Sequence, residues 1–114
     1  MREDKLSIQS MDFAVSVIEL VKGLKEKRES IISNQIGRSG TSIGANIREA
    51  FYAHSKADFV SKLQIALKEC YETEYWSELL IDGGYYNNKE IQEKCIEIKK
   101  ILISSINTAK ENMK

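Results

Sequence analysis

Apolar residues recur along the first part of the chain at alternating steps of four and three, the spacing of one face of an α-helix. The members of this stripe are Leu6, Ser10, Phe13, Val17, Leu20 and Leu24, with Ala14, Ile18 and Val21 expected to widen it. Lysines and an arginine follow, and positive charge stabilises the carboxyl end of a helix. The pattern predicts an amphipathic helix that ends between Lys25 and Glu29.

Three further segments are expected to be helical. The second segment covers roughly residues 28–54 and has a side rich in isoleucine. Ser55 with Asp58, and Asn87 with Glu90, each form a pair typical of a helix N-terminus, while Gly83 and Gly84 end the helix between them. Four helices with short connections predict an all-α, antiparallel up-down four-helix bundle that forms a single domain over residues 1–114.

Three glycines interrupt the second segment on one face. Gly37, Gly40 and Gly44 each cost about 0.5 to 1 kcal/mol relative to alanine inside a helix. We therefore expect a neighbouring element to approach this face closely.

A second stripe on the third helix repeats at helical spacing, on the side that the pattern places opposite the core. Its members are Ile65, Glu69, Glu72, Trp76 and Leu79. A contiguous apolar surface that includes a tryptophan usually marks a contact, so we expect self-association through this face. Two arginines of the second helix, Arg38 and Arg48, are the expected partners of its glutamates, within or between chains. The alternative is a surface tryptophan that lies flat under long side chains.

Small polar residues form another stripe beside the isoleucines of the second helix. Its members are Gln35, Ser39, Ser42, Asn46 and Glu49. Buried polar groups need partners, so we expect this stripe to be a buried hydrogen-bond ladder inside the bundle or across subunits. Ligand binding is the alternative.

Composition limits the classes of partner and the cellular location that we expect for this protein. Seventeen basic residues balance seventeen acidic ones, so the chain has none of the bulk positive charge typical of proteins that bind nucleic acids or membrane surfaces. No apolar run approaches the roughly 20 residues that span a bilayer. Cys70 and Cys95 lie on apolar helical stripes, where buried thiols are favoured over a disulfide. We expect a cytoplasmic protein without a membrane partner.

The sequence offers little for catalysis. Its single histidine, His54, excludes the paired histidine ligands of di-iron bundles, and we expect it to be solvated or to cap a helix. Glu74 points toward the apolar side, where a hydrogen bond to the second helix is our default interpretation. We expect no catalytic residue, no metal site, no cofactor and no enzymatic activity.

The two central helices resemble a known family. The residues that carry the likeness are Gln35, Arg38-Ser39, Ser42-Ile43, Ala45-Asn46-Ile47 and Glu49, followed by Lys62-Leu63, Ile65-Ala66, Lys68-Glu69, Glu72-Thr73 and Tyr75-Trp76. This pattern resembles the 23S rRNA-intervening sequence protein family. The resemblance implies a small bacterial four-helix bundle, often encoded within insertions in ribosomal RNA genes, that assembles as a ring of five; it implies no biochemical activity.

A related branch of that family comprises accessory proteins of diversity-generating retroelements, which are basic pentamers that bind nucleic acid and a reverse transcriptase. This chain differs in charge, since residues 1–54 hold 8 basic and 7 acidic groups and residues 55–114 hold 9 and 10. It also has Ala50 and Phe51 where many members have an acidic residue and a glycine.

Two functions follow from these observations. The first is a non-enzymatic homo-oligomer, a pentamer by resemblance, that acts as a scaffold for a partner. The second is RNA or DNA binding, directly or beside a nucleic-acid-handling protein, through a basic rim in which a ring repeats one cluster. The cluster consists of Lys22, Lys25, Lys27 and Arg28.

Overall fold

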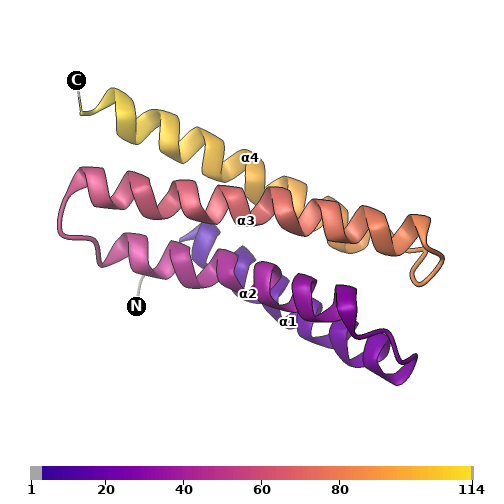
Figure 1. Cartoon of the computed structure of the whole chain (residues 1–114). Coiled ribbons are helices and arrows are strands. Elements are labelled where there is room, and N and C mark those ends of the chain that lie inside the picture. The colour runs from indigo at the N-terminus through magenta and orange to yellow at the C-terminus, as the bar shows by residue number, and fades with distance from the viewer. Residues whose placement is uncertain (1–3, 114) are drawn as a thin grey trace.

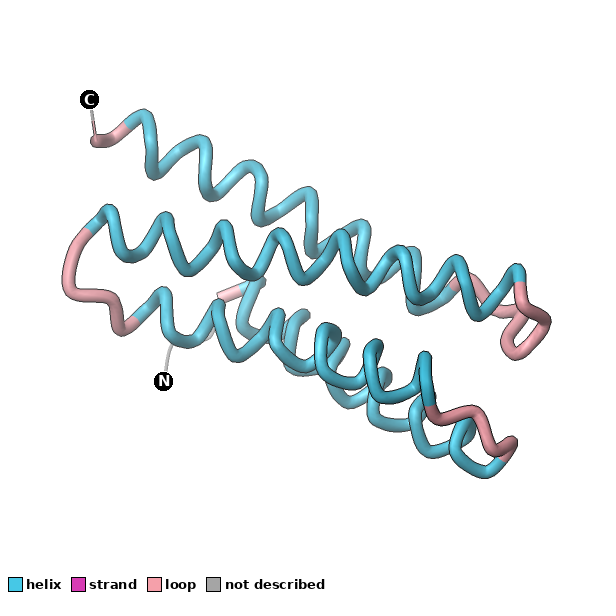
Figure 2. The backbone as a smooth tube through the Cα atoms, in the orientation of Figure 1, coloured by secondary structure: helices cyan, strands magenta, loops and turns pink. Residues whose placement is uncertain are grey.

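The computed structural model describes residues 4–113, which fold into helices and contain no strand (Figure 1). The helices are α1 (Lys5–Glu26), α2 (Ile31–Phe51), α3 (Lys56–Asp82) and α4 (Glu90–Glu111). Consecutive helices run in opposite directions, and short loops join them at alternate ends (Figure 2). Each helix packs mainly against two others, so that α1 and α3 lie diagonally across the core. The prediction of four helices is confirmed.

Local sequence signals set most helix ends. Asp4 accepts a hydrogen bond from the Ser7 amide at 2.9 Å, and Ser55 accepts one from the Asp58 amide at 3.1 Å, as the capping pattern predicted for α3. The predicted cap of α4 at Asn87 is wrong by one residue, because Asn88 is the side chain that accepts from the Glu90 amide, at 2.8 Å.

The break between α1 and α2 lies where the sequence placed it, but it lacks a glycine. Arg28 adopts a left-handed conformation with φ of 63°, and the Glu29 amide then reaches back to the Leu24 carbonyl at 2.9 Å. This arrangement is the usual C-terminal cap of a helix with an arginine in the glycine position. The second helix consequently begins at Ile31 and ends at Phe51, inside the predicted range of residues 28–54.

The buried carboxylate of Glu29 holds the start of α2. Its two oxygens accept hydrogen bonds from the amides of Ile31, Ile32 and Ser33 at 3.2, 3.1 and 2.7 Å. These three amides have no acceptor within the helix, and a negative charge at a helix N-terminus is favourable. Glu29 thus fixes the angle at which α2 leaves α1.

The apolar stripes predicted from spacing form the core. Along α1 the buried residues are Leu6, Ser10, Phe13, Val17 and Leu24. Ile18 contradicts the prediction that it widens this stripe, because 47% of its surface is exposed.

The three glycines of α2 face α1, as their shared face predicted. A methyl group on Gly40 would lie 2.8 Å from Val17 Cγ2, and one on Gly44 would lie 3.3 Å from Ser10 Oγ. A methyl group on Gly37 would make an ordinary contact of 3.4 Å with Val21. The glycines therefore let α1 pack against the backbone of α2.

Candidate interaction surface

The face of α3 predicted for self-association is only partly turned to solvent. Ile65 and Leu79 expose 40% and 38% of their surface. Glu69 is buried, and Trp76 is half-buried against the small cluster that contains Leu24 and other core residues. The prediction that this face lies opposite the core is therefore wrong, because α2 packs against one side of it.

Arg38 ties α2 to this face of α3 within the chain. Its guanidinium contacts Glu69 at 3.3 Å and both carboxylate oxygens of Glu72 at 2.9 Å. The hydrogen bond to Glu72 raises the pKa of Arg38, whereas burial raises the pKa of Glu69 despite the nearby arginine. The ion pairs predicted for Arg38 exist inside one chain, and exposure limits its pair with Glu72 to about 0 to 1 kcal/mol.

Arg48, the second predicted interface arginine, lies apart from these glutamates. It lines a groove of about 430 Å³ between α1 and α2, together with residues such as Met11, Ile18 and Ala45. The seven residues predicted to form one interface therefore belong to two surfaces.

The polar stripe of α2 is not a buried ladder in this chain. Only Ser39 is fully buried, and its hydroxyl accepts a hydrogen bond from the Thr73 hydroxyl of α3 at 2.8 Å. Ser42 and Asn46 donate to carbonyls of their own helix at 2.7 and 2.9 Å.

The stripe ends in solvent at both extremes. Gln35 is exposed, and Glu49 is exposed and pairs with Lys62 of α3 at 3.3 Å. The prediction that these two residues are buried is wrong, because α3 does not cover them and their side chains face solvent. Within the described residues, the stripe acts as a polar border between α2 and α3.

The basic cluster occupies one end of the molecule. Lys22, Lys25, Lys27 and Arg28 are all exposed. The Lys27 ammonium donates to the Tyr85 carbonyl at 3.2 Å, which places the cluster beside the turn between α3 and α4. An aromatic side chain and positive charge therefore share this end.

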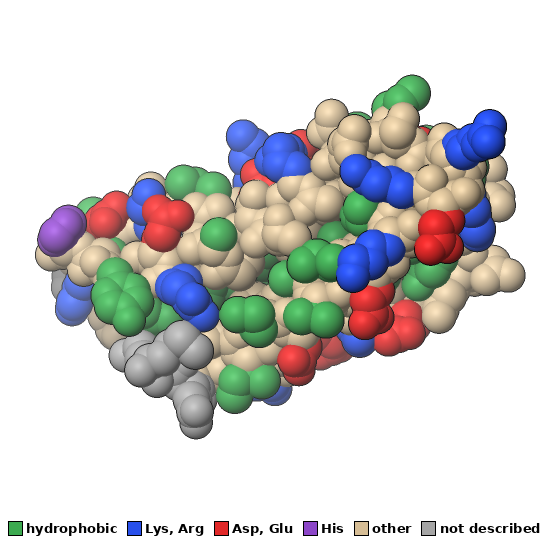
Figure 3. All heavy atoms as spheres, turned by 90° about the horizontal axis from the view of Figure 1, so that it is seen from below, with side chains coloured by type: hydrophobic (Ala, Val, Ile, Leu, Met, Phe, Trp, Pro, Cys, Tyr) green, Lys and Arg blue, Asp and Glu red, His purple; other side chains and the backbone are tan. Residues whose placement is uncertain are grey.

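An exposed apolar stripe on α1 was missed. Ile8, Met11, Val15 and Ile18 expose 51, 50, 50 and 47% of their surface. Figure 3 shows the side of the molecule turned toward α1 and α2, where hydrophobic side chains gather between charged ones. The sequence contains the signal, as steps of three, four and three, but spacing alone does not separate this stripe from the core stripe of the same helix. We call these four residues the α1 stripe.

Candidate chemical groups are engaged in structural contacts. Glu74 pairs with Lys99 of α4 at 2.7 Å, and this carboxylate raises the pKa of the lysine. The expected hydrogen bond from Glu74 to the second helix is therefore wrong, because this side of α3 faces α4. His54 is exposed near the start of α3.

Both cysteines are buried and unbridged, as predicted, and Cys95 Sγ donates to the Cys70 carbonyl at 3.4 Å. Over residues 4–113, no three His, Cys, Asp or Glu side chains gather as a metal site would require. Nor does any helix in that range have the length and apolarity to cross a membrane.

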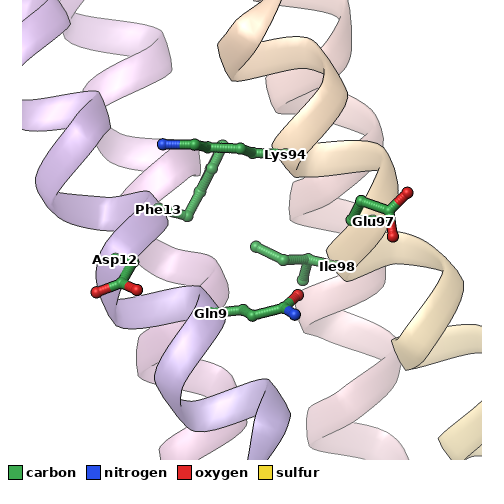
Figure 4. A pocket seen from close by; sticks show the side chains of 6 residues that line it. All are labelled: Gln9, Asp12, Phe13, Lys94, Glu97 and Ile98. Carbon is green, nitrogen blue, oxygen red and sulfur yellow. The ribbon is translucent and has the colours of Figure 1, made fainter.

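A cavity of about 270 Å³ separates parts of α1 and α4. Its lining includes Phe13 and Ile98, and Gln9 and Lys94 extend into the gap from opposite helices (Figure 4). Lys94 crosses it to donate to the Ser16 hydroxyl at 3.2 Å. The cavity is smaller than the roughly 300 to 1,000 Å³ usual for ligand sites.

Comparison with known proteins gives a consistent assignment. The model of the family described as 23S rRNA-intervening sequence protein matches residues 3–104. A crystal structure of a protein of unknown function from the S23 ribosomal protein family of Bacteroides thetaiotaomicron is 52% identical, with a TM-score of 0.87. The alignment covers 89% of this chain and 97% of that one. No curated protein matches this chain.

Proposed function

Because this chain belongs to the 23S rRNA-intervening sequence protein family, we propose that it is a non-enzymatic four-helix bundle that associates with itself and presents a surface to a partner. The proposed assembly is a ring, with five copies as the number that the family resemblance favours. The proposed location is the cytoplasm.

One observation supports self-association most directly. The outer side of α3 carries an exposed apolar line, Ile65, Tyr75 and Leu79, with exposed fractions of 40, 56 and 38%. We call these three residues the α3 patch. The half-buried Trp76 ring lies 5.0 Å from the Tyr75 ring, and aromatic side chains next to aliphatic ones are typical of interface centres. Arg38 and its two glutamates lie at the border of the patch.

The mass in solution tests this proposal. One chain has a mass of 13.0 kDa, so light scattering coupled to gel filtration separates a monomer from any assembly. Ile65→Glu with Leu79→Glu places two charges on the α3 patch and is expected to reduce the native assembly to monomers. Ile31→Glu is the matched control, because Ile31 is an exposed isoleucine at the start of α2, outside the patch. A native chain that runs as a monomer refutes the proposal.

A second candidate function is supported by the basic cluster. Its four side chains are exposed, and the hydrogen bond from Lys27 to the Tyr85 carbonyl places the turn that carries Tyr85 beside them. A ring would repeat this end of the molecule, so weak single contacts would add up. Phosphate contacts release counterions, so binding to RNA or DNA is expected to weaken steeply as salt rises.

Fluorescence anisotropy with labelled RNA and DNA tests this candidate. The measurement starts at low salt and compares the native chain with Lys22→Glu, Lys25→Glu. Loss of binding in the variant and a negative salt slope in the native chain support it. Absence of binding at low salt refutes it and leaves self-association untouched.

A further inference from the structure

The α1 stripe has the spacing of a seam between two helices. Its residues follow each other at steps of three, four and three, which is the repeat of a coiled-coil contact. A helix that faces the core of a bundle carries a wider apolar stripe than this. On α1 that wider stripe is the buried one, which lies on the opposite side of the helix. The α1 stripe is therefore a second, narrow contact line with no covering element among the described residues.

The groove between α1 and α2 extends this line sideways. Met11 and Ile18 form its α1 wall, and Thr41, Gly44 and Ala45 form its α2 wall. The small side chains in the middle of the second wall leave room for another helix to approach, and Arg48 and Glu49 line the groove at one end. Four half-exposed side chains cover only a few hundred Å², whereas a stable interface buries about 800 Å² on each partner, so an occupant must fill the groove as well.

We propose that the groove between α1 and α2 and the α1 stripe receive the α3 patch of a second copy of this chain. The contact is head to tail, since it joins two different surfaces of the same protein. This inference rests on the proposed self-association and names the missing half of its interface.

The position of the two surfaces supports this pairing. α1 and α3 are diagonal helices of the bundle, so the faces that they turn away from the core point in opposite directions. A chain with complementary surfaces on opposite sides forms rings when the rotation closes and filaments when it does not. The lengths also correspond, because at 1.5 Å per residue the α1 stripe spans about 15 Å and the α3 patch about 21 Å.

The charges around the two surfaces are complementary. Asp12 and Glu19 flank the α1 stripe on the side turned toward α4, and Lys68 lies within the α3 patch; all three side chains are exposed. Among residues 4–113 none of these three forms an ion pair within the chain. A positive charge within the α3 patch and two negative charges beside the α1 stripe favour this occupant.

A mixing experiment tests the pairing. Val15→Glu with Ile18→Glu disables the α1 stripe, and Ile65→Glu with Leu79→Glu disables the α3 patch. Each variant alone is expected to be a monomer of 13.0 kDa. In an equimolar mixture each partner contributes the surface that the other lacks, so the expected product is a dimer of twice 13.0 kDa, about 26 kDa.

The outcomes separate this inference from the proposed function. A monomeric native chain overturns both. A native assembly that survives Val15→Glu with Ile18→Glu overturns the pairing alone and leaves another protein as the occupant of the groove. Two monomeric variants that yield no dimer on mixing also overturn it.

Two controls check that the variants still fold. Circular dichroism must show native helix content for each variant, which is expected because the four substituted side chains are between 38 and 50% exposed. Should the glutamate variant of the α1 stripe unfold, Val15→Ser with Ile18→Ser removes the apolar contact without adding charge. That variant must also lose the native mass, and retention of the native mass overturns the inference.

Discussion

Gly40 provides the sharpest test of how α1 and α2 pack. A methyl group at this position would lie 2.8 and 2.9 Å from the two terminal carbons of Val17 and 3.3 Å from its Cβ. Val17 is fully buried and its side chain has essentially one rotamer in a helix, so it cannot turn aside. The helices must separate or the side chain must strain, at a cost of about 1 to 3 kcal/mol.

The substitution Gly40→Ala also has a favourable part. Alanine gains about 0.5 to 1 kcal/mol over glycine inside a helix. The net expectation is a loss of roughly 1 kcal/mol in the free energy of unfolding, with about 2 kcal/mol as the upper range. For a domain of this size that loss lowers the melting temperature by roughly 4 °C.

Two other glycines serve as matched controls. A methyl group on Gly23 meets nothing within 4 Å, and one on Gly37 makes only a 3.4 Å contact with a valine methyl group. Gly23→Ala is therefore expected to stabilise the chain by about 0.5 to 1 kcal/mol, with Gly37→Ala close behind. From the most to the least stable, the order predicted from these distances is Gly23→Ala, Gly37→Ala, the native chain and Gly40→Ala.

Urea denaturation followed by circular dichroism measures these differences. A second variant checks the cause, since Val17→Ala removes the two methyl groups that a new side chain at position 40 would meet. In the Val17→Ala background, Gly40→Ala should become neutral or stabilising. Two results would contradict this reasoning: Gly40→Ala stabilises the otherwise native chain, or it keeps its full cost in the Val17→Ala background. Either result would mean that Gly40 is not needed for the close packing of α1 against α2.

Three further predictions concern single side chains. Arg28→Gly is expected to stabilise the chain by about 1 kcal/mol in urea denaturation, because an arginine at φ of 63° carries steric strain that glycine avoids; unchanged stability would contradict this. Cys70 and Cys95 should react with Ellman's reagent only after unfolding, since a hydrogen bond with Cys70 and burial raise the pKa of the Cys95 thiol. Reaction in the native state would show that the core opens. Burial raises the pKa of Glu69, so its protonated form favours folding at low pH and this contribution is lost as the pH rises through the folded pKa. Glu69→Gln should therefore lose less stability than the native chain when denaturation curves are compared from pH 4 to pH 7, and an equal loss would refute the assignment.

Periodicity and capping chemistry predict the four helices because both act within a few residues. The inward positions Phe13 and Val17 follow from spacing, and the N-terminus of α3 follows from the hydroxyl of Ser55. The close approach at Gly40 also follows from the sequence, since three glycines on one helical face leave room for a neighbour. These features need no knowledge of which helices are adjacent.

The errors arise where that knowledge is needed. The sequence predicts an exposed Trp76, but its side chain packs against a core cluster. A helical pattern gives the angular position of each residue around its own helix, but it does not say how much of the helix surface the neighbouring helices cover. Ile18 looked buried for the same reason, and Glu74 was assigned to α2 although α4 lies on that side. Burial on the flanks of a helix depends on how the helices are arranged around the core, which no single stripe encodes.

The cavity between α1 and α4 has a consequence for local motion. Across it the Lys94 ammonium meets Ser16, whereas glycines and small hydroxyl side chains hold α1, α2 and α3 in close contact. Segments with the fewest buried contacts open first and exchange their amide hydrogens without global unfolding. The contact between α1 and α4 is thus expected to open before the contacts of α2 with α1 and α3.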